Sequence, residues 1–217
     1  MLLIRQGFLS PTLCRNLIAG FQQISETYTE ADDYVRRYED RTSICGIAIK
    51  RAGIDGVSDE LNEIRQRAAD ALCRFYGVAG PTRIDFTLAA EMRAGDCLPA
   101  HADNESCNDD GVWTPNHTSY HHCAAQLYLN NCGIDYEGGL LRFPSFEQEI
   151  IPEAGMLVGF MCDRNYQHEV TPIQHGRRYA ISIWVTQDAE HEEDWDQTVT
   201  EPHPLRDPGE HSLTPDV

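Results

Sequence analysis

Short apolar stretches separated by turn residues fill the chain from residue 83 to 186, and this pattern constrains the fold more than any other feature. Glycines mark the expected turns, as in Ala94-Gly95-Asp96, Glu137-Gly138-Gly139 and His175-Gly176. The pattern predicts a sandwich or a jelly roll rather than a helical domain. The expected strands are 84–92, 97–103, 123–129, 140–143, 148–151, 156–161, 168–171 and 178–186.

Two amphipathic helices are expected before these strands. Ser10-Pro11 is a typical helix start, and apolar residues recur at helical spacing as far as Ile24. A second helix is expected over about 58–76, with an apolar stripe that ends before Gly77. An initial strand at 2–8 and a long polar loop carrying a strand at 44–49 complete this part. We expect the helices to support a sheet, so the fold class is mainly β with flanking helices.

The length of 217 residues fits one domain. We expect a single domain over residues 1–187, with the N-terminal strand and supporting helices at 1–82 and a jelly-roll core at 83–187. Residues 188–217 are rich in Asp, Glu and Pro, which predicts a partly ordered acidic tail.

The charge balance excludes some partners. Asp and Glu number 35 against 17 Lys and Arg, for a net charge of −18. Such a surface repels phosphate backbones and anionic lipids, so neither nucleic acid nor a membrane is expected as a partner. None of the eight cysteines forms a CxxC pair, which excludes a zinc ribbon. Met1 to Ile4 is followed at once by Arg5, without the apolar run of a signal peptide, so we expect a cytoplasmic protein with reduced thiols.

The segment Pro99-Ala100-His101-Ala102-Asp103-Asn104 places a histidine and a carboxylate two residues apart. Side chains alternate along a strand, so His101 and Asp103 fall on one face and can share a metal ion. Two histidines and one carboxylate suit non-haem Fe(II), which keeps open positions for other ligands. We select His168 as the third ligand because it opens a strand ten residues before Arg178. The candidates for this position are His117, His121, His122, His168 and His175.

Arg178 and Ser182 fall on one face of the last expected strand, with Ala180 between them. A guanidinium on an inward face needs a carboxylate, and its forked shape suits bidentate binding of one. The hydroxyl of Tyr128 can reach the same anion.

Two further residues are expected near a substrate. Trp184 shares the strand face of Arg178 and is interpreted as an apolar wall of the pocket, with core packing as the alternative. Asn104 follows the metal ligands directly and is the residue of that segment best placed to face the substrate.

These residues lie in a segment that resembles a known protein family. The chain from about residue 84 to 187 resembles the catalytic domain of Fe(II)/2-oxoglutarate-dependent prolyl hydroxylases. The His-Ala-Asp-Asn form and the long loop after it look most like the prolyl 3-hydroxylase branch, and Arg41-Thr42-Ser43 is similar to a segment of 4-hydroxylase relatives. The matching segments are His101 to Asn104, Leu127 to Asn130, Glu137 to Leu140, Ile151-Pro152 with Gly155, Gly159-Phe160, His168 to Val170 and Gly176 to Trp184.

The resemblance implies a double-stranded β-helix with iron on His101, Asp103 and His168. It places the distal carboxylate of the co-substrate 2-oxoglutarate on Arg178, assisted by Tyr128 and Ser182. Dioxygen is the second co-substrate, with ascorbate as a candidate reductant. Residues 1–187 would then be the catalytic domain of a dioxygenase.

The expected reaction is hydroxylation of an unactivated C–H bond, on a prolyl residue or on a small amino-acid-like molecule. A carboxylate at position 103 favours hydroxylation over halogenation. Two alternatives stay open: a biosynthetic oxygenase that hydroxylates, desaturates or closes a ring in a small molecule, and a metal-binding jelly-roll module without catalysis.

Overall fold

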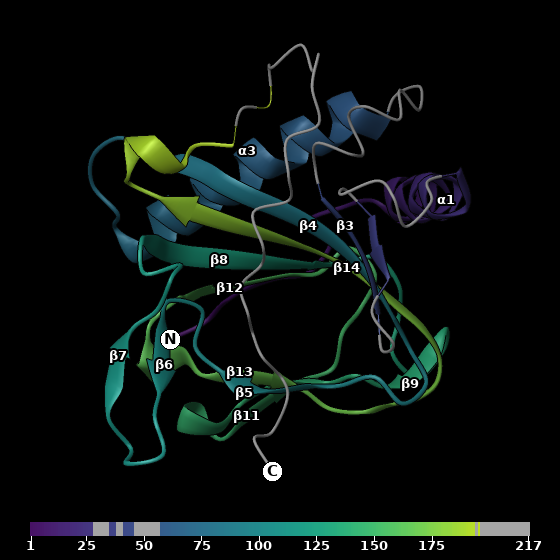
Figure 1. Cartoon of the computed structure of the whole chain (residues 1–217). Helices are drawn as coiled ribbons and strands as arrows, with labels where there is room; N and C mark the ends of the chain where they lie inside the picture. Colours follow the sequence, from purple (N-terminus) through teal and green to yellow (C-terminus); the bar gives the residue numbers. More distant parts are fainter. Residues whose placement is uncertain (28–34, 38–40, 46–56, 194, 196–217) are drawn as a thin grey trace.

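Figure 1 shows the computed structural model, which describes residues 1–27, 35–37, 41–45, 57–193 and 195. Part of the strand expected at 44–49 and most of the acidic tail lie outside these described residues. The strands are β1 Leu3–Arg5, β2 Val35–Arg37, β3 Arg41–Cys45, β4 Arg83–Arg93, β5 Leu98–His101, β6 Glu105–Cys107, β7 Trp113–Pro115, β8 His121–Tyr128, β9 Tyr136–Gly138, β10 Leu141–Phe143, β11 Gln148–Ile150, β12 Leu157–Met161, β13 His168–Val170 and β14 Ile173–Thr186. The helices are α1 Pro11–Thr27, α3 Val57–Tyr76, η1 Pro144–Phe146, η2 Arg164–Tyr166 and η3 Ala189–His191.

Two antiparallel sheets face each other. The larger sheet has the order β1-β12-β8-β14-β4-β3-β2, with β9 also paired to β14, and the smaller has the order β11-β10-β13-β5. A separate ribbon of β6 and β7 projects beside one end of the sheets, and both long helices lie on the outer face of the larger sheet (Figure 1). The structure therefore has three layers, and the space between the two sheets holds the side chains discussed below.

The helices are held by an apolar core on the outer face of the larger sheet. Leu61, Ile64 and Leu72 of α3 are each at most 1% exposed and pack with residues such as Leu127 and Ile181 of the strands. Each such buried side chain contributes roughly 1.5–3 kcal/mol. The sequence expectation that the helices support a sheet is confirmed.

Alternation along β14 divides its side chains between two layers. Tyr179, Ile181 and Ile183 enter the helix-side core, whereas Arg178 and Ser182 line a cavity between the sheets. The strand thus carries polar side chains into the interior while its other face anchors the helices.

The turn expected at His175-Gly176 is wrong, because β14 already begins at Ile173 and continues through both residues. Gly176 has a φ of +81°, and a Cβ there would lie 2.5 Å from the backbone oxygen of Asp135. The glycine is needed for a close approach to the neighbouring chain and not for a reversal of direction.

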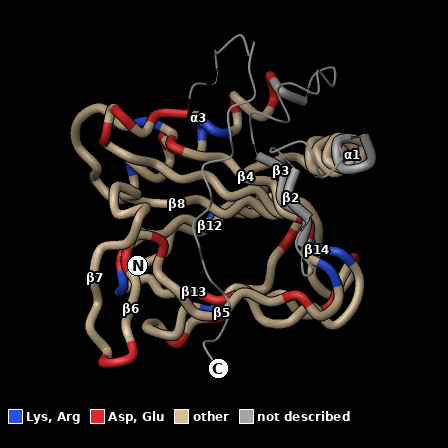
Figure 2. The backbone as a smooth tube through the Cα atoms, in the orientation of Figure 1, with Lys and Arg blue, Asp and Glu red and all other residues tan. Residues whose placement is uncertain are grey.

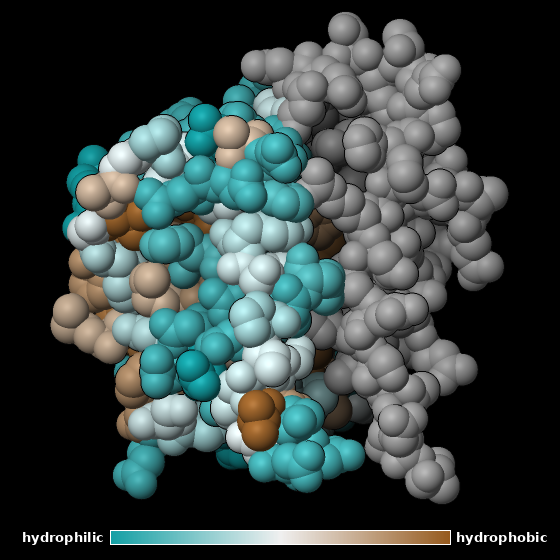
Figure 3. All heavy atoms as spheres, turned by 60° about the vertical axis from the view of Figure 1, so that its left-hand side comes forward, coloured by the Kyte–Doolittle hydropathy of each residue, from teal (hydrophilic) through white to brown (hydrophobic). Residues whose placement is uncertain are grey.

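Acidic residues are spread over both sheets and α3 rather than gathered at one end (Figure 2). On the side that carries the β6–β7 ribbon, hydrophilic residues cover most of the described surface (Figure 3). Among the described residues, no helix has both the length and the apolar character that crossing a membrane requires.

Candidate metal centre and co-substrate pocket

His101 and His168 lie directly opposite each other on paired strands. His101 ends β5 and His168 begins β13, and the two residues are register partners in the smaller sheet. Their ring centroids are 4.4 Å apart. Strand pairing therefore fixes the distance between two residues that are far apart in the sequence.

Both imidazoles present the same nitrogen toward the interior. The Nδ1 atom of His101 lies 2.9 Å from the carbonyl oxygen of Pro99, and Nδ1 of His168 lies 3.1 Å from that of Tyr166. A carbonyl oxygen only accepts hydrogen bonds, so in each ring Nδ1 carries the proton and Nε2 keeps its lone pair. Each Nε2 is thereby ready to bind a metal ion.

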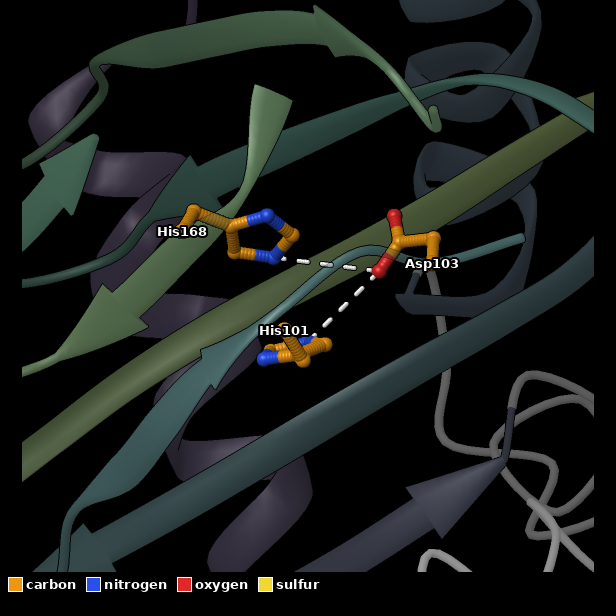
Figure 4. Close-up of side chains that lie close together, drawn as sticks. All are labelled: His101, Asp103 and His168. Carbon is orange, nitrogen blue, oxygen red and sulfur yellow. Dashed lines mark ion pairs between the residues drawn. The ribbon is translucent and has the colours of Figure 1, made fainter. Parts of the chain in front are cut away.

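Asp103 completes the group from the turn after β5. Its Oδ1 lies 3.6 Å from Nε2 of His101 and 3.7 Å from Nε2 of His168 (Figure 4). The backbone oxygen of Asp103 accepts hydrogen bonds from Thr118 Oγ1 at 2.6 Å and from Asn116 Nδ2 at 3.1 Å. The long loop after the metal motif therefore holds the carboxylate in place.

The surrounding charges keep Asp103 ionised. Burial by itself raises the pKa of this carboxyl, but the positive charge of the His168 and His101 imidazoles when they are protonated, together with the hydrogen bond from Trp184, brings the net pKa below its ordinary value. An ionised carboxylate and two neutral imidazoles are the donor set of a facial triad for Fe(II).

His101, Asp103 and His168 are the group of possible metal ligands found among the described residues, with ligand atoms within 4.8 Å of one another. Other histidines considered from the sequence have different surroundings. His121 pairs with Asp85 at 2.8 Å, and His175 lies 3.1 Å from Glu137 on the surface.

Arg178 is 2% exposed and lies in the same cavity as the three ligands, whose volume is about 410 Å³. Its Nη1 donates to the sulfur of Met92 at 3.4 Å. The Nε and Nη2 atoms have no hydrogen-bond partner among the described residues, so no carboxylate among them binds either atom. A buried cation with free donors fits an anionic ligand, such as the distal carboxylate of 2-oxoglutarate.

Two buried tyrosines accompany this guanidinium. The Arg178 Cζ atom lies 5.1 Å from the ring centre of Tyr128, and the hydroxyls of Tyr128 and Tyr136 make no hydrogen bond to a described residue. Burial raises the pKa of both phenols, with the charge of Arg178 acting in the opposite direction. Both hydroxyls therefore stay protonated and can donate to an anion.

Tyr136 was missed from the sequence, although the adjacent glycines give a signal. Gly139 has a φ of +64°, and a Cβ there would lie 3.0 Å from Cδ of Arg178 and 3.2 Å from the ring of Tyr136. Gly139 lets the chain pass closely over the side chains of Arg178 and Tyr136.

The contacts of the three other residues predicted for the site are as follows. The hydroxyl of Ser182 donates to Oε1 of Gln126 at 2.8 Å, and both residues line the cavity. Trp184 also lines the cavity, and its indole N–H donates to Oδ2 of Asp103 at 3.1 Å. The amide of Asn104 donates to the backbone oxygen of His121 at 2.9 Å, and Asn104 is not among the cavity-lining residues of the described chain.

The end of the cavity away from Arg178 is polar. His191, on η3 after the last strand, stacks on Tyr120 with ring centroids 3.5 Å apart. A β-bulge in β4, opposite Trp184 and Val185, turns Asp85 into the cavity beside His121.

A jelly roll with a two-histidine, one-carboxylate group beside a buried arginine defines the class of non-haem iron oxygenases. Residues 87–186 match the family model described as the 2OG-Fe(II) oxygenase superfamily, whose members use Fe(II), 2-oxoglutarate and dioxygen. Residues 87–186 are therefore similar to a 2OG-Fe(II) oxygenase domain, and the expected double-stranded β-helix is confirmed.

Proteins with related sequences and folds include prolyl hydroxylases. Human prolyl 3-hydroxylase 1 is 32% identical over 109 residues, which cover 46% of this chain but only 14% of that protein. A viral collagen prolyl hydroxylase from Paramecium bursaria Chlorella virus-1, solved as a 2OG complex, has a TM-score of 0.62 at 15% identity, covering 85% of this chain and 94% of its own. A Trichoplax adhaerens prolyl hydroxylase, in complex with a hypoxia inducible factor peptide fragment, has a TM-score of 0.60 at 19% identity and covers 88% and 85% of the two chains.

Proposed function

We propose that this protein is an Fe(II)- and 2-oxoglutarate-dependent dioxygenase that hydroxylates a prolyl residue in a peptide. The observation that carries the proposal is one cavity with two complementary groups. A set of three metal ligands lies beside Arg178, a buried cation that pairs with no carboxylate among the described residues.

The residues fit the iron and its co-substrate, and each has a distinct role. His101, Asp103 and His168 would hold Fe(II), which with 2-oxoglutarate and dioxygen supplies the oxidising power for C–H hydroxylation. Arg178 would bind the far carboxylate of 2-oxoglutarate through Nε and Nη2, with the hydroxyl of Tyr128 donating to the same group. The apolar walls of the cavity exclude water from that ion pair and so strengthen it.

A peptidyl-proline substrate is supported by the related proteins and by the space in the cavity away from Arg178. Arg178 takes the co-substrate end of the cavity, so the substrate would enter at the end formed by Tyr120, His121 and His191. Free amino acids and other small molecules are the alternative substrates. A cytoplasmic location and the exclusion of nucleic acid remain predictions from the sequence.

The activity is tested by iron-dependent formation of succinate from 2-oxoglutarate. We expect His101→Ala to abolish it, because the facial triad loses a ligand, and His175→Ala to leave it unchanged, because His175 is a surface residue paired with Glu137. Normal turnover by His101→Ala would reject the metal site.

The substrate class is tested separately. Proline-containing peptides, free amino acids and metabolites are incubated with the iron-loaded protein and read by a mass gain of one oxygen. Oxygen gained by a peptide at proline supports the proposal, and oxygen gained only by free small molecules favours the biosynthetic alternative. Absence of 2-oxoglutarate binding would favour a non-catalytic module.

A further inference from the structure

The two carboxylate oxygens of Asp103 have different neighbours. Oδ1 faces the Nε2 atoms of both histidines, at 3.6 and 3.7 Å. Oδ2 points away from them and accepts the indole N–H of Trp184 at 3.1 Å. Only one oxygen of the carboxylate is therefore directed at the place where a metal ion would lie.

The indole that holds Oδ2 is itself fixed by its neighbours. Trp184 lies between Phe86 and His121, with ring centroids 5.9 and 5.8 Å away and interplanar angles of 31° and 20°. His121 is in turn held by Asp85, at 2.8 Å from its Nε2. On the neighbouring strand the register partner of Trp184 is Ala124, a small residue that leaves room for the indole.

We propose that Trp184 is a positioning residue that makes Asp103 a metal ligand through one oxygen only. The inference rests on the proposed metal site and deepens it. An octahedral ion held by three protein atoms keeps three positions open. Two of them are needed for chelation by 2-oxoglutarate and one for dioxygen, so a second bond from Asp103 would remove a position that the reaction needs.

The test is Trp184→Phe, which keeps an aromatic ring between Phe86 and His121 but removes the N–H donor. Co(II) is used in place of Fe(II), because its visible absorption reports coordination number and its complexes are stable in air. Binding of 2-oxoglutarate to the Co(II)-loaded protein is measured by calorimetry. We expect about tenfold weaker binding of 2-oxoglutarate, the usual scale for loss of a hydrogen bond to a metal ligand, together with an altered Co(II) spectrum.

Trp195→Phe is the matched control, since Trp195 lies against Arg65 on the other side of the larger sheet. We expect its Co(II) spectrum and its 2-oxoglutarate affinity to match the wild type. If Trp184→Phe binds 2-oxoglutarate within twofold of the wild type and leaves the spectrum unchanged, the positioning role is rejected.

A third variant separates this failure from a failure of the metal site. If His101→Ala binds Co(II) as well as the wild type does, the three ligands are wrongly assigned and both proposals fall. If His101→Ala loses Co(II) while Trp184→Phe behaves as the wild type, only the role of Trp184 is rejected.

Discussion

Arg65 and Arg178 are both almost completely buried, with 1% and 2% of their surfaces exposed, but their surroundings are opposite. Arg65, on α3, donates from Nε to Thr87 at 2.7 Å and forms an ion pair with Glu193. The ring of Trp195 covers its guanidinium at 4.0 Å. Arg178 has a sulfur and two tyrosine rings around it, and no carboxylate among the described residues.

The difference suggests that the charge of Arg65 stabilises the fold, whereas the charge of Arg178 is suited to binding a ligand. A buried cation is costly unless an anion accompanies it. For Arg65 the protein supplies that anion from beyond the last strand, and the segment after β14 is thereby fastened to α3. Burial raises the pKa of Glu193 to about 7 even though Arg65 acts to lower it, so desolvation outweighs the attraction of this pair. For Arg178 no such anion is present among the described residues, so an anionic ligand would have to offset the cost of burying the guanidinium.

The largest expected effect is on stability at Arg65. Arg65→Met keeps an unbranched apolar stem but removes the cation beside the buried carboxyl of Glu193, which costs about 3–5 kcal/mol of unfolding free energy where that carboxyl is ionised. Urea unfolding measures the loss. The affinity for 2-oxoglutarate should not change, because Arg65 lies outside the cavity.

Arg67→Met is the control, because Arg67 is on the same helix with a 48% exposed side chain, and its ion pair, with Glu63 at 3.9 Å, is on the surface. A surface pair of this kind contributes at most ~1 kcal/mol. Equal losses in the two variants would show that burial of Arg65 has no special cost.

At Arg178 the same substitution should act on binding instead. Arg178→Met removes the guanidinium that would bind the distal carboxylate of 2-oxoglutarate. We expect the affinity for 2-oxoglutarate to fall by about 100-fold, or ~2.7 kcal/mol. Stability without ligand should fall little or rise, because an uncompensated charge is removed. Calorimetry on the Co(II)-loaded protein and urea unfolding give the two quantities.

Arg177→Met is the matched control at the neighbouring position. Arg177 points to the other face of β14, has a 55% exposed side chain and lies 3.5 Å from Glu91. Its loss should leave 2-oxoglutarate affinity unchanged. An Arg178→Met protein that still binds 2-oxoglutarate within threefold of the wild type would remove Arg178 from the binding site.

The same comparison shows what the sequence can predict. Alternation along 178–186 places Arg178 and Ser182 on the inward face, because that pattern depends only on local strand geometry. The His-x-Asp spacing brings together two of the proposed ligands, although β5 ends at His101 and Asp103 lies in the turn after it. The ion pair of Arg65 with Glu193 joins residues 128 positions apart, so no local sequence pattern predicts it. Glu193 lies in a stretch whose composition predicts a partly ordered acidic tail.

Asp85 and Trp184 show a second limit of prediction from the sequence. A bulge in β4 changes which face Asp85 occupies, and strand periodicity read along the sequence cannot place a bulge. The position of Trp184 in the cavity follows from alternation, but its bond to Asp103 depends on how two sheets face each other. Pairings across the space between sheets are therefore the part of the site that needed the structure.

The smallest expected effect concerns the tyrosine beside Arg178. Tyr128→Phe removes a buried hydroxyl without a partner among the described residues, so stability without ligand should be unchanged or slightly higher. Affinity for 2-oxoglutarate should fall by about tenfold, because one hydrogen bond to a charged carboxylate contributes ~1.5 kcal/mol. Tyr179→Phe is the opposite case: its hydroxyl donates to Glu91 at 2.8 Å, so its loss should lower stability and leave 2-oxoglutarate affinity intact. If Tyr128→Phe instead loses stability and keeps its affinity, the Tyr128 hydroxyl is a structural group like that of Tyr179, and Arg178 holds the anion without it.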